Sequence, residues 1–333
     1  MGAEDLGQVL TRIAPFDHSW VDPDVGAWED AALVRPETGP PLAFTVDFIT
    51  PIVDEPETFG AVAAANALSD VYAMGGEPQV ALAVCGFPED RISTEILERI
   101  FRGGRDKAAE AGCAIVGGHT VIDPELKYGL CVIGRIDPRG ALSQTRARVG
   151  DRLVLTKPLG LGIAAHAIKQ QTLASADLER VVTTMTALNR GAKDAALAAG
   201  AQAATDITGF GLLGHLHHLL LGSKRSARLF ADAVPVFDFV RPLAEAGGIP
   251  GGTRKNLAYV EPHTRFDPAL SPTERLILAD AQTSGGLLIA VRPENEATLL
   301  KELERHGALA RAVVGEVVEG QAGAIEVVGQ LQP

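Results

Sequence analysis

An alanine-rich stretch over residues 60–74 is the feature that most constrains the fold of this chain. Its sequence, GAVAAANALSDVYAM, is small and apolar nearly all round, which predicts a helix that is buried on every side. Asn66 and Asp70 are four residues apart and therefore share one face of that helix. A buried carboxylate needs a charged partner or a metal ion. The residues alone leave open whether Asp70 forms a buried ion pair or contacts a metal or a nucleotide.

Strand and helix patterns alternate along the rest of the chain. In its first part they predict strands over 42–48, 79–87, 114–118 and 128–136, and helices over 4–13 and 93–112. In its second part they predict strands over 152–157, 226–231, 286–292, 312–318 and 324–328, and helices over 160–170, 177–199 and 209–222. A linker with Pro138, Gly140 and Gly150 separates the parts. We expect an α/β (α+β) protein with domains at residues 1–140 and 150–333.

The charge of the chain bears on its partners. The net charge is −12, whereas nucleic acid and anionic membranes need a basic surface, so neither is expected as a partner. No segment resembles an export signal or approaches the ~18 uninterrupted apolar residues of a membrane span. An acidic protein can still bind nucleotides, because divalent metal ions bridge carboxylates and phosphates.

The three cysteines point to a reducing compartment. Cys85, Cys113 and Cys131 lie far apart in apolar runs, which fits neither a disulfide framework nor a zinc site. They are interpreted as buried structural thiols. The expected location is therefore the cytoplasm.

Further aspartates are candidates for holding metal. Asp47 closes an apolar strand, where α/β folds place ligand-binding groups, although a turn or cap aspartate is the alternative. Asp30 lies between a loop and an apolar run, and Asp206 lies between a short strand and a Gly-rich helix start. Taken singly, Asp206 favours a helix N-cap role. Dispersed aspartates that converge in space can bind Mg²⁺, but spacing does not show that these do.

Glycine and histidine clusters give weaker signals. VGGHT (116–120), PGGTRKN (250–256, a polar loop) and QTSGGL (282–287) can bring backbone close to an anion, although most Gly-Gly pairs are only turns. The chain has no GxxxxGK[ST] P-loop, and GFGLLG (209–214) lacks the rest of a dinucleotide-binding unit. His215, His217 and His218 favour surface or packed histidines over a metal site. The residues alone leave open a phosphate-containing ligand held through aspartates and magnesium without a P-loop.

Several segments together resemble one family. DFITPIVDEP, NALSDVYAMGGEP, GGHT, LTKPLGLG, TDITGFGLLGHL, PGGTRKN and DAQTSGGLL resemble selenophosphate synthetase (selenide, water dikinase) in the same order, over about residues 5–328. This family belongs to the aminoimidazole ribonucleotide synthetase-like superfamily. The resemblance implies a two-domain subunit whose N-terminal sheet pairs with that of a second copy, forming a barrel across a homodimer. It also implies that selenide, ATP and water yield selenophosphate, phosphate and AMP, with Mg²⁺ holding the triphosphate.

The resemblance also implies site residues, motif by motif. The expected ATP contacts are Ala27, Trp28, Glu29, Asp47, Asp70, Gly118, His119 and Thr120. Gly118, His119 and Thr120 would reach the ATP of the other subunit. The expected metal ligands are Asp30, Asp70 and Asp206.

One part of the family pattern has no match in this sequence. The family has a Gly-rich loop with a reactive cysteine or selenocysteine and, three residues on, a catalytic lysine. No lysine precedes Lys107 here, and none of the three cysteines matches that motif, so no catalytic residue is assigned. Either a selenocysteine codon upstream of Met1 was read as a stop, which the genomic DNA tests, or the chain is a natural variant. We expect the chain as written to bind ATP–Mg with little or no selenide turnover.

Two alternatives stay open on the sequence. One is a related enzyme of the superfamily that acts on a thiamine or purine precursor. The other is a non-catalytic dimer that binds ATP–Mg without releasing phosphate to any acceptor. Substrate profiling separates the two from selenophosphate synthesis.

Overall fold

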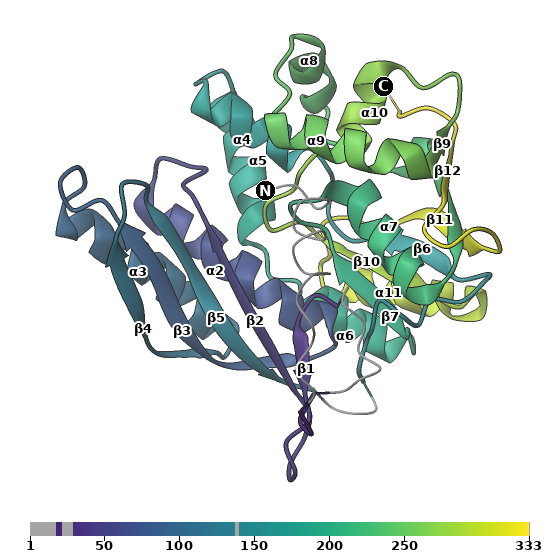
Figure 1. Cartoon of the computed structure of the whole chain (residues 1–333). Coiled ribbons are helices and arrows are strands. Elements are labelled where there is room, and N and C mark those ends of the chain that lie inside the picture. Colours follow the sequence, from purple (N-terminus) through teal and green to yellow (C-terminus); the bar gives the residue numbers. More distant parts are fainter. Residues whose placement is uncertain (1–17, 22–28, 137–139, 333) are drawn as a thin grey trace.

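The computed structural model describes residues 18–21, 29–136 and 140–332 (Figure 1). The helix expected over 4–13 lies outside these residues, as do Ala27 and Trp28. The described chain forms two units, each built on its own sheet, and the predicted mixed α/β class is confirmed. No helix among the described residues is long and apolar enough to cross a membrane.

The first sheet has five strands in the order β1-β2-β5-β3-β4. They are β1 (Ala32–Val34), β2 (Leu42–Ile49), β3 (Glu77–Phe87), β4 (Ala114–Ile122) and β5 (Lys127–Arg135). The β3–β4 pair is parallel and the other pairs are antiparallel. Helices α2 (Pro56–Ala73) and α3 (Thr94–Glu110) lie together along one face of this sheet (Figure 1).

Helix α2 lies between the first sheet and the second unit. It packs on α3, β2 and β5 on one side and on α5, α6 and β7 on the other. Fourteen of its 18 residues are buried, as its apolar composition predicts. The crossing with α3 is close, since a Cβ at Gly60 would overlap the Ile100 carbonyl and a Cβ at Gly103 would overlap that of Glu57. The helix begins earlier than expected, at Pro56, because the Glu55 side chain accepts a hydrogen bond from Thr58 N at 2.7 Å.

The second sheet has seven strands in the order β7-β10-β6-β11-β8-β12-β9. They are β6 (Arg152–Leu155), β7 (Ala203–Asp206), β8 (Ser226–Phe230), β9 (Thr264–Phe266), β10 (Leu287–Val291), β11 (Ala312–Val318) and β12 (Ile325–Val328). The helices are α4 (Leu161–Lys169), α5 (Ser175–Thr186), α6 (Arg190–Ala198), α7 (Gly211–Ser223), α8 (Val240–Glu245), α9 (Gly251–Val260), α10 (Pro272–Leu278) and α11 (Glu296–Arg305). Short 3-10 turns lie at 231–233, 261–263 and 293–295.

Two sequence predictions about helices in this unit are wrong. The single helix expected over 177–199 is two helices, α5 and α6, with a break at residues 187–189. PGGTRKN is not a loop, because residues 251–260 form α9. Tertiary hydrogen bonds outweigh the low helix propensity of the Gly-Gly pair, since Asn256 Nδ2 donates to Gly209 O at 2.8 Å and the Thr253 hydroxyl donates to Asp280.

One face of the first sheet is apolar, and no other described segment covers it. Val46, Cys131 and Leu82 are direct cross-strand neighbours on β2, β5 and β3, on the face opposite α2 and α3. Val46 is 57% exposed, Leu82 is 44% exposed and Phe48 is 51% exposed. Strand β4 is one of the two edge strands of this sheet, and most of its residues are exposed. Uncovered apolar sheet faces of this kind mark interaction surfaces.

Candidate functional site

Four aspartates from separate parts of the chain converge between the two units. Asp47 lies on β2, Asp70 on α2, Asp206 at the end of β7, and Asp30 just before β1. The pKa of Asp70 is well above its ordinary value, because of burial first and then the negative charges of Asp206, Asp47 and Asp30. The four carboxylates are therefore close enough to repel one another.

The N-terminal half of the cluster is fixed by β2 and α2. Thr45 and Asp47 are two residues apart on β2 and so point to the same face, toward α2. The Thr45 hydroxyl donates to Asp70, and Asn66 Nδ2 donates to Asp47 Oδ2 at 2.6 Å. Burial raises the pKa of Asp47. The turn or cap role that the residues favoured for Asp47 is wrong, because this side chain lies within the strand and faces a helix.

The other half comes from Asp30 and Asp206. Asp30 Oδ1 accepts hydrogen bonds from Gln144 Nε2 and Thr205 Oγ1, both at 2.8 Å. The second oxygens, Asp30 Oδ2 and Asp206 Oδ2, are buried and have no hydrogen-bond partner among the described residues. Burial raises the pKa of Asp206 to about 6, against a lowering by a hydrogen bond from Ser69. Asp206 ends a strand and α7 begins only at Gly211, so the predicted N-cap role is wrong.

Glu29 anchors the segment that carries Asp30. The Ser143 hydroxyl donates to one of its carboxylate oxygens, and Gln144 N donates to the other at 3.1 Å. Burial raises the pKa of Glu29. The linker after the first sheet thus holds residues 29 and 30 beside β7.

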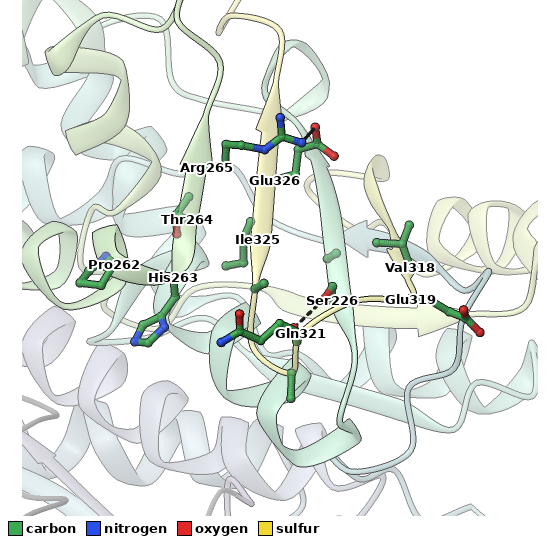
Figure 2. A pocket seen from close by; sticks show the side chains of 13 residues that line it. Ser226, Pro262, His263, Thr264, Arg265, Val318, Glu319, Gln321, Ile325 and Glu326 are labelled. Atoms are coloured by element: carbon green, nitrogen blue, oxygen red, sulfur yellow. Dashed lines mark hydrogen bonds and ion pairs between the residues drawn. The ribbon is translucent and has the colours of Figure 1, made fainter.

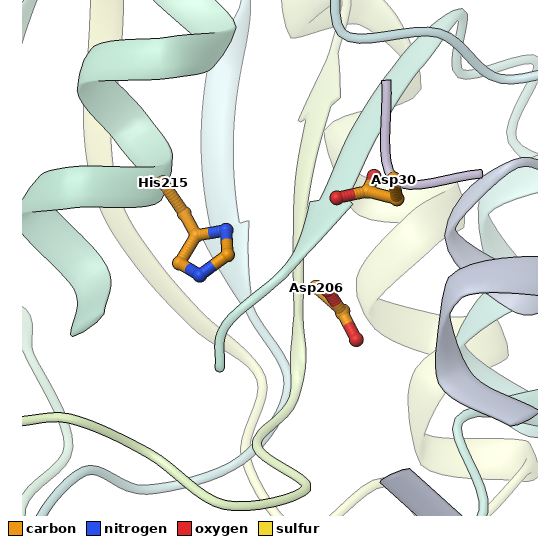
Figure 3. Close-up of side chains that lie close together, drawn as sticks. All are labelled: Asp30, Asp206 and His215. Carbon is orange, nitrogen blue, oxygen red and sulfur yellow. The ribbon is translucent and has the colours of Figure 1, made fainter. Parts of the chain in front are cut away.

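His215 joins this cluster from α7. Its ring lies beside Asp30 and Asp206, and one potential ligand atom from each of the three residues falls within 4.8 Å of the others (Figure 3). Nε2 accepts a hydrogen bond from Thr208 N at 3.2 Å, and burial lowers the pKa of His215 to about 3. The Nε2 lone pair of the neutral ring is therefore occupied by the hydrogen bond from the turn after Asp206 and is not free to bind a metal ion. We interpret His215 as a support for that turn.

The other two histidines of the cluster on α7 are packed, as predicted. His217 Nδ1 bonds Gly323 O at 2.7 Å, and His218 Nε2 bonds the Tyr259 hydroxyl at 3.1 Å. Both side chains are buried. The cysteines behave similarly: all three are free, Cys85 and Cys113 are buried, and Cys131 is half-buried.

The charge balance and the donor atoms of the aspartate cluster fit Mg²⁺. Lys157 is buried near Asp206, and its Nζ donates to the Ala187 and Ser284 carbonyls, both at 2.7 Å. Burial lowers the pKa of Lys157 to about 7. One ammonium does not balance four carboxylates. Hard cations prefer carboxylate oxygens, and Asp30 and Asp206 each present one to which no residue in the described part of the chain donates.

Comparisons with known proteins identify the relatives of this chain. Residues 28–136 match the AIR synthase related protein N-terminal domain, and residues 148–328 match the C-terminal domain of the same family. A selenide, water dikinase from Myxococcus xanthus is 44% identical over 330 residues, covering 98% of this chain and 93% of the relative. The chain belongs to the selenide, water dikinase family. A second family member, from Pelobacter propionicus, is 48% identical over 295 residues, covering 87% of this chain and 84% of the relative.

Solved structures of more distant proteins share the fold of this dikinase family member. The hydrogenase maturation protein HypE in complex with ATP has a TM-score of 0.70 at 24% identity, covering 92% of this chain and 86% of HypE. AaThiL complexed with AMPPCP and TMP has a TM-score of 0.71 at 19% identity, covering 100% of this chain and 95% of that one. The predicted two-domain aminoimidazole ribonucleotide synthetase-like fold is thereby confirmed.

The glycines of the family motifs have different surroundings. A Cβ at Gly285 would overlap the Ile207 carbonyl oxygen, and one at Gly286 would meet Lys157 N at 2.5 Å. The glycines of TSGG thus allow close backbone packing beside the aspartates. A Cβ at Gly209 or Gly252 would meet nothing within 4 Å.

The segment 118–120 does not join the aspartates within one chain of this family member. It lies on the edge strand β4, three strands away from β2, which corresponds to roughly 14 Å. Gly118, His119 and Thr120 are exposed there. Their contact with the ATP of a second subunit stays a prediction.

A hollow outside the aspartate cluster has few polar groups that are free to bind a ligand. It has a volume of about 400 Å³ and lies over β8, β9 and β12 (Figure 2). Its polar groups largely satisfy one another, because Arg265 pairs with Glu326 and the Ser226 hydroxyl donates to Gln321 O at 2.6 Å. None of the four aspartates lines it.

Sequence reasoning missed three polar residues that pack around the aspartate cluster. They are Ser69, Lys157 and Asn189, all buried. Ser69 and Lys157 gave a usable signal, because each is a polar residue inside an otherwise apolar run. Asn189 gave none, since it sits in what looked like one continuous helix.

Proposed function

We propose that this protein makes selenophosphate from selenide, ATP and water, and releases AMP and phosphate. The observation that carries the proposal is the four-aspartate cluster, in a chain that belongs to the selenide, water dikinase family. Two relatives named selenide, water dikinase match this chain over most of their length, one over 93% and the other over 84%. A related kinase acting on thiamine or purine precursors is not favoured by these identities.

In this proposal Asp30, Asp70 and Asp206 hold Mg²⁺ and Asp47 and Asp70 face the nucleotide phosphates. Two carboxylate oxygens, Asp30 Oδ2 and Asp206 Oδ2, support this role, because no residue that the structure describes donates a hydrogen bond to them. When bound, magnesium would neutralise charge on the phosphoryl oxygens during transfer. The protein's own part is to hold the carboxylates in one buried place before ATP arrives, so that little reorganisation is needed.

The nucleotide would also contact residues 27–29 and the edge strand of a second subunit. Glu29 uses both carboxylate oxygens on Ser143 and Gln144, so it fixes the path of this segment. Gly118, His119 and Thr120 lie on an exposed edge strand, which supports a contribution to a neighbouring subunit. The uncovered apolar face of the first sheet supports a homodimer in which two such sheets form a barrel.

The cytoplasm is the proposed compartment. All three cysteines are free, and burial raises the pKa of Cys85 and Cys113 to about 11. Such thiols are unreactive structural groups of the kind found in reduced proteins. The net charge of −12 supports small anions bound through metal rather than nucleic acid as partners.

The identity of the adenine nucleotide product, AMP or ADP, tests the proposed reaction. The full gene product is incubated anaerobically with ATP, Mg²⁺ and selenide, and nucleotides are separated by chromatography while phosphorus NMR detects selenophosphate. We expect AMP to form only when selenide is present. ADP as the end product, or phosphate transfer to thiamine monophosphate in place of selenide, would show that the proposed function is wrong.

A further inference from the structure

A buried polar seam joins α2 to the loop that precedes β10. Asn66 on α2 uses both ends of its carboxamide there, because Nδ2 donates to Asp47 Oδ2 at 2.6 Å and Oδ1 accepts from Ser284 N at 2.8 Å. Asn66 is 4% exposed. One side chain of the N-terminal unit thus contacts a site aspartate and the backbone of the C-terminal unit at once.

A second asparagine contacts the same loop from the other unit. Asn189 precedes α6, and its Nδ2 donates to Gly285 O at 2.9 Å and to Ser69 Oγ at 2.8 Å. Ser69 lies on α2, close enough to Asp206 for its hydroxyl to lower the pKa of that carboxylate against the larger effect of burial. Asn189 is also 4% exposed. Its carboxamide therefore reaches Asp206 through one intervening hydroxyl.

The loop between the two asparagines is held rigidly. Ser284 adopts a φ of 54°, which non-glycine residues seldom do, and its carbonyl accepts from Lys157 Nζ at 2.7 Å. Gly285 has no space for a side chain against the Ile207 carbonyl. Because this backbone is fixed from both sides, the hydrogen bonds of Asn66 and Asn189 define how α2 sits against the C-terminal sheet.

We propose that Asn66 and Asn189 are positioning residues for phosphoryl transfer. They lock α2 to residues 284–285 and thereby hold Asp47 and Asp206 in one metal–phosphate site. Asn66 acts on Asp47 directly, and Asn189 acts on Asp206 through Ser69. This role rests on the proposed function and adds to it two residues that orient metal-binding and phosphate-facing carboxylates.

The first test removes the Asn189 hydrogen bonds and measures Mg²⁺-dependent ATP binding. In Asn189→Ala and in the isosteric Asn189→Asp, we expect the Mg²⁺ concentration for half-maximal ATP binding to rise on the order of 10-fold, as for other partners that orient metal ligands. Ser226→Ala is the matched control. It removes a buried hydroxyl that donates to Gln321 O at 2.6 Å, four strands away from β7 in the same sheet. An unchanged Mg²⁺ dependence in both Asn189 variants would overturn the proposal.

A double-mutant cycle then separates positioning from general stability. If Asn189 acts through Ser69, then Ser69→Ala combined with Asn189→Ala weakens Mg²⁺-dependent ATP binding no more than the stronger single variant does. If the two residues only stabilise the fold, the losses of thermal stability in the single variants should add in the double variant. The Mg²⁺ dependence of ATP binding should then stay unchanged in all three variants. Additive losses of Mg²⁺-dependent binding would contradict the relay.

A third measurement does not depend on the proposed reaction. Hydrogen exchange of peptides spanning residues 280–286 is followed in the metal-free and nucleotide-free protein. Since Asn66 accepts from Ser284 N, we expect that amide to exchange on the order of 10-fold faster in Asn66→Ala. Faster exchange in Asn66→Ala, together with no selenide-dependent AMP from the wild-type full gene product, would refute the reaction and keep the clamp. Unchanged exchange would refute the clamp itself.

Discussion

Asp30 and Asp206 lie close together, and each has one buried carboxylate oxygen without a hydrogen-bond partner among the described residues. Burial raises the pKa of Asp30 most, and the negative charge of Asp206 raises it further. Two such groups repel each other in a protein without metal and attract a cation between them. The same pair of carboxylates therefore lowers the stability of the metal-free protein and supplies ligands when a metal ion is bound.

Asp206→Asn is expected to stabilise the metal-free protein and to abolish its response to magnesium. The amide keeps the shape and removes a buried charge, so the free energy of unfolding in EDTA should rise by about 1–3 kcal/mol. Mg²⁺-dependent ATP binding should fall by more than ~100-fold, since a ligand is lost. Urea unfolding and isothermal calorimetry measure the two effects. Lower stability in EDTA would mean that the carboxylate is satisfied by protein groups alone.

The two kinds of glycine environment predict opposite substitution effects. In Gly285→Ala the new Cβ overlaps the Ile207 carbonyl oxygen, so unfolding should become easier by about 2–3 kcal/mol. Gly252→Ala meets open space in the first turn of α9 and should be neutral or stabilising by up to ~1 kcal/mol. Urea midpoints of both variants check this. Equal destabilisation of the two variants would show that the space around the Cβ position does not decide the effect.

How far the sequence predicted this structure depends on whether a feature is local. Helix α2 was predictable because an apolar composition on every face requires burial whatever the partner is. The break before Asn189 was not, since residues 177–199 keep a helical pattern and only the contact with Ser69 and Gly285 reveals the turn. α9 was missed for a similar reason, because the bonds of Thr253 and Asn256 are tertiary.

The site followed the same division. Each aspartate was visible as a carboxylate in or beside an apolar run, and family motifs selected Asp30, Asp47, Asp70 and Asp206. Their proximity depends on strand order and on the packing of α2 between two sheets, which residue spacing does not encode. The role of a supporting group such as Lys157 was not predictable, although the residue stands out in the sequence, because its partners are backbone carbonyls far along the chain.

His218 is expected to make stability depend on pH in the acid range. Burial is the main cause that lowers its pKa, from 6.5 to about 4, so the unfolded chain binds its proton first as the pH falls. The stability that His218 contributes is present above pH ~6.5 and is lost as the pH falls toward ~4, by up to ~3 kcal/mol. His218→Gln cannot take up this proton. Urea unfolding at pH 7.5 and 4.5 should show the wild type losing stability relative to the variant, and a constant difference would contradict the prediction.

The uncovered sheet face predicts a dimer that a single charge disrupts. Phe48 is 51% exposed on β2, on the same face as Val46, and Phe48→Glu places a carboxylate among apolar side chains that a second copy would bury. Light scattering should give twice the 34.9 kDa chain mass for the wild type and the chain mass for Phe48→Glu. Leu309→Glu is the matched control, because Leu309 is 45% exposed in the C-terminal unit and should leave the mass unchanged. If residues 118–120 complete the partner's ATP site, then the monomeric variant also loses ATP binding while its four aspartates remain in place. A monomeric variant with unchanged ATP binding would confine the nucleotide site to one subunit.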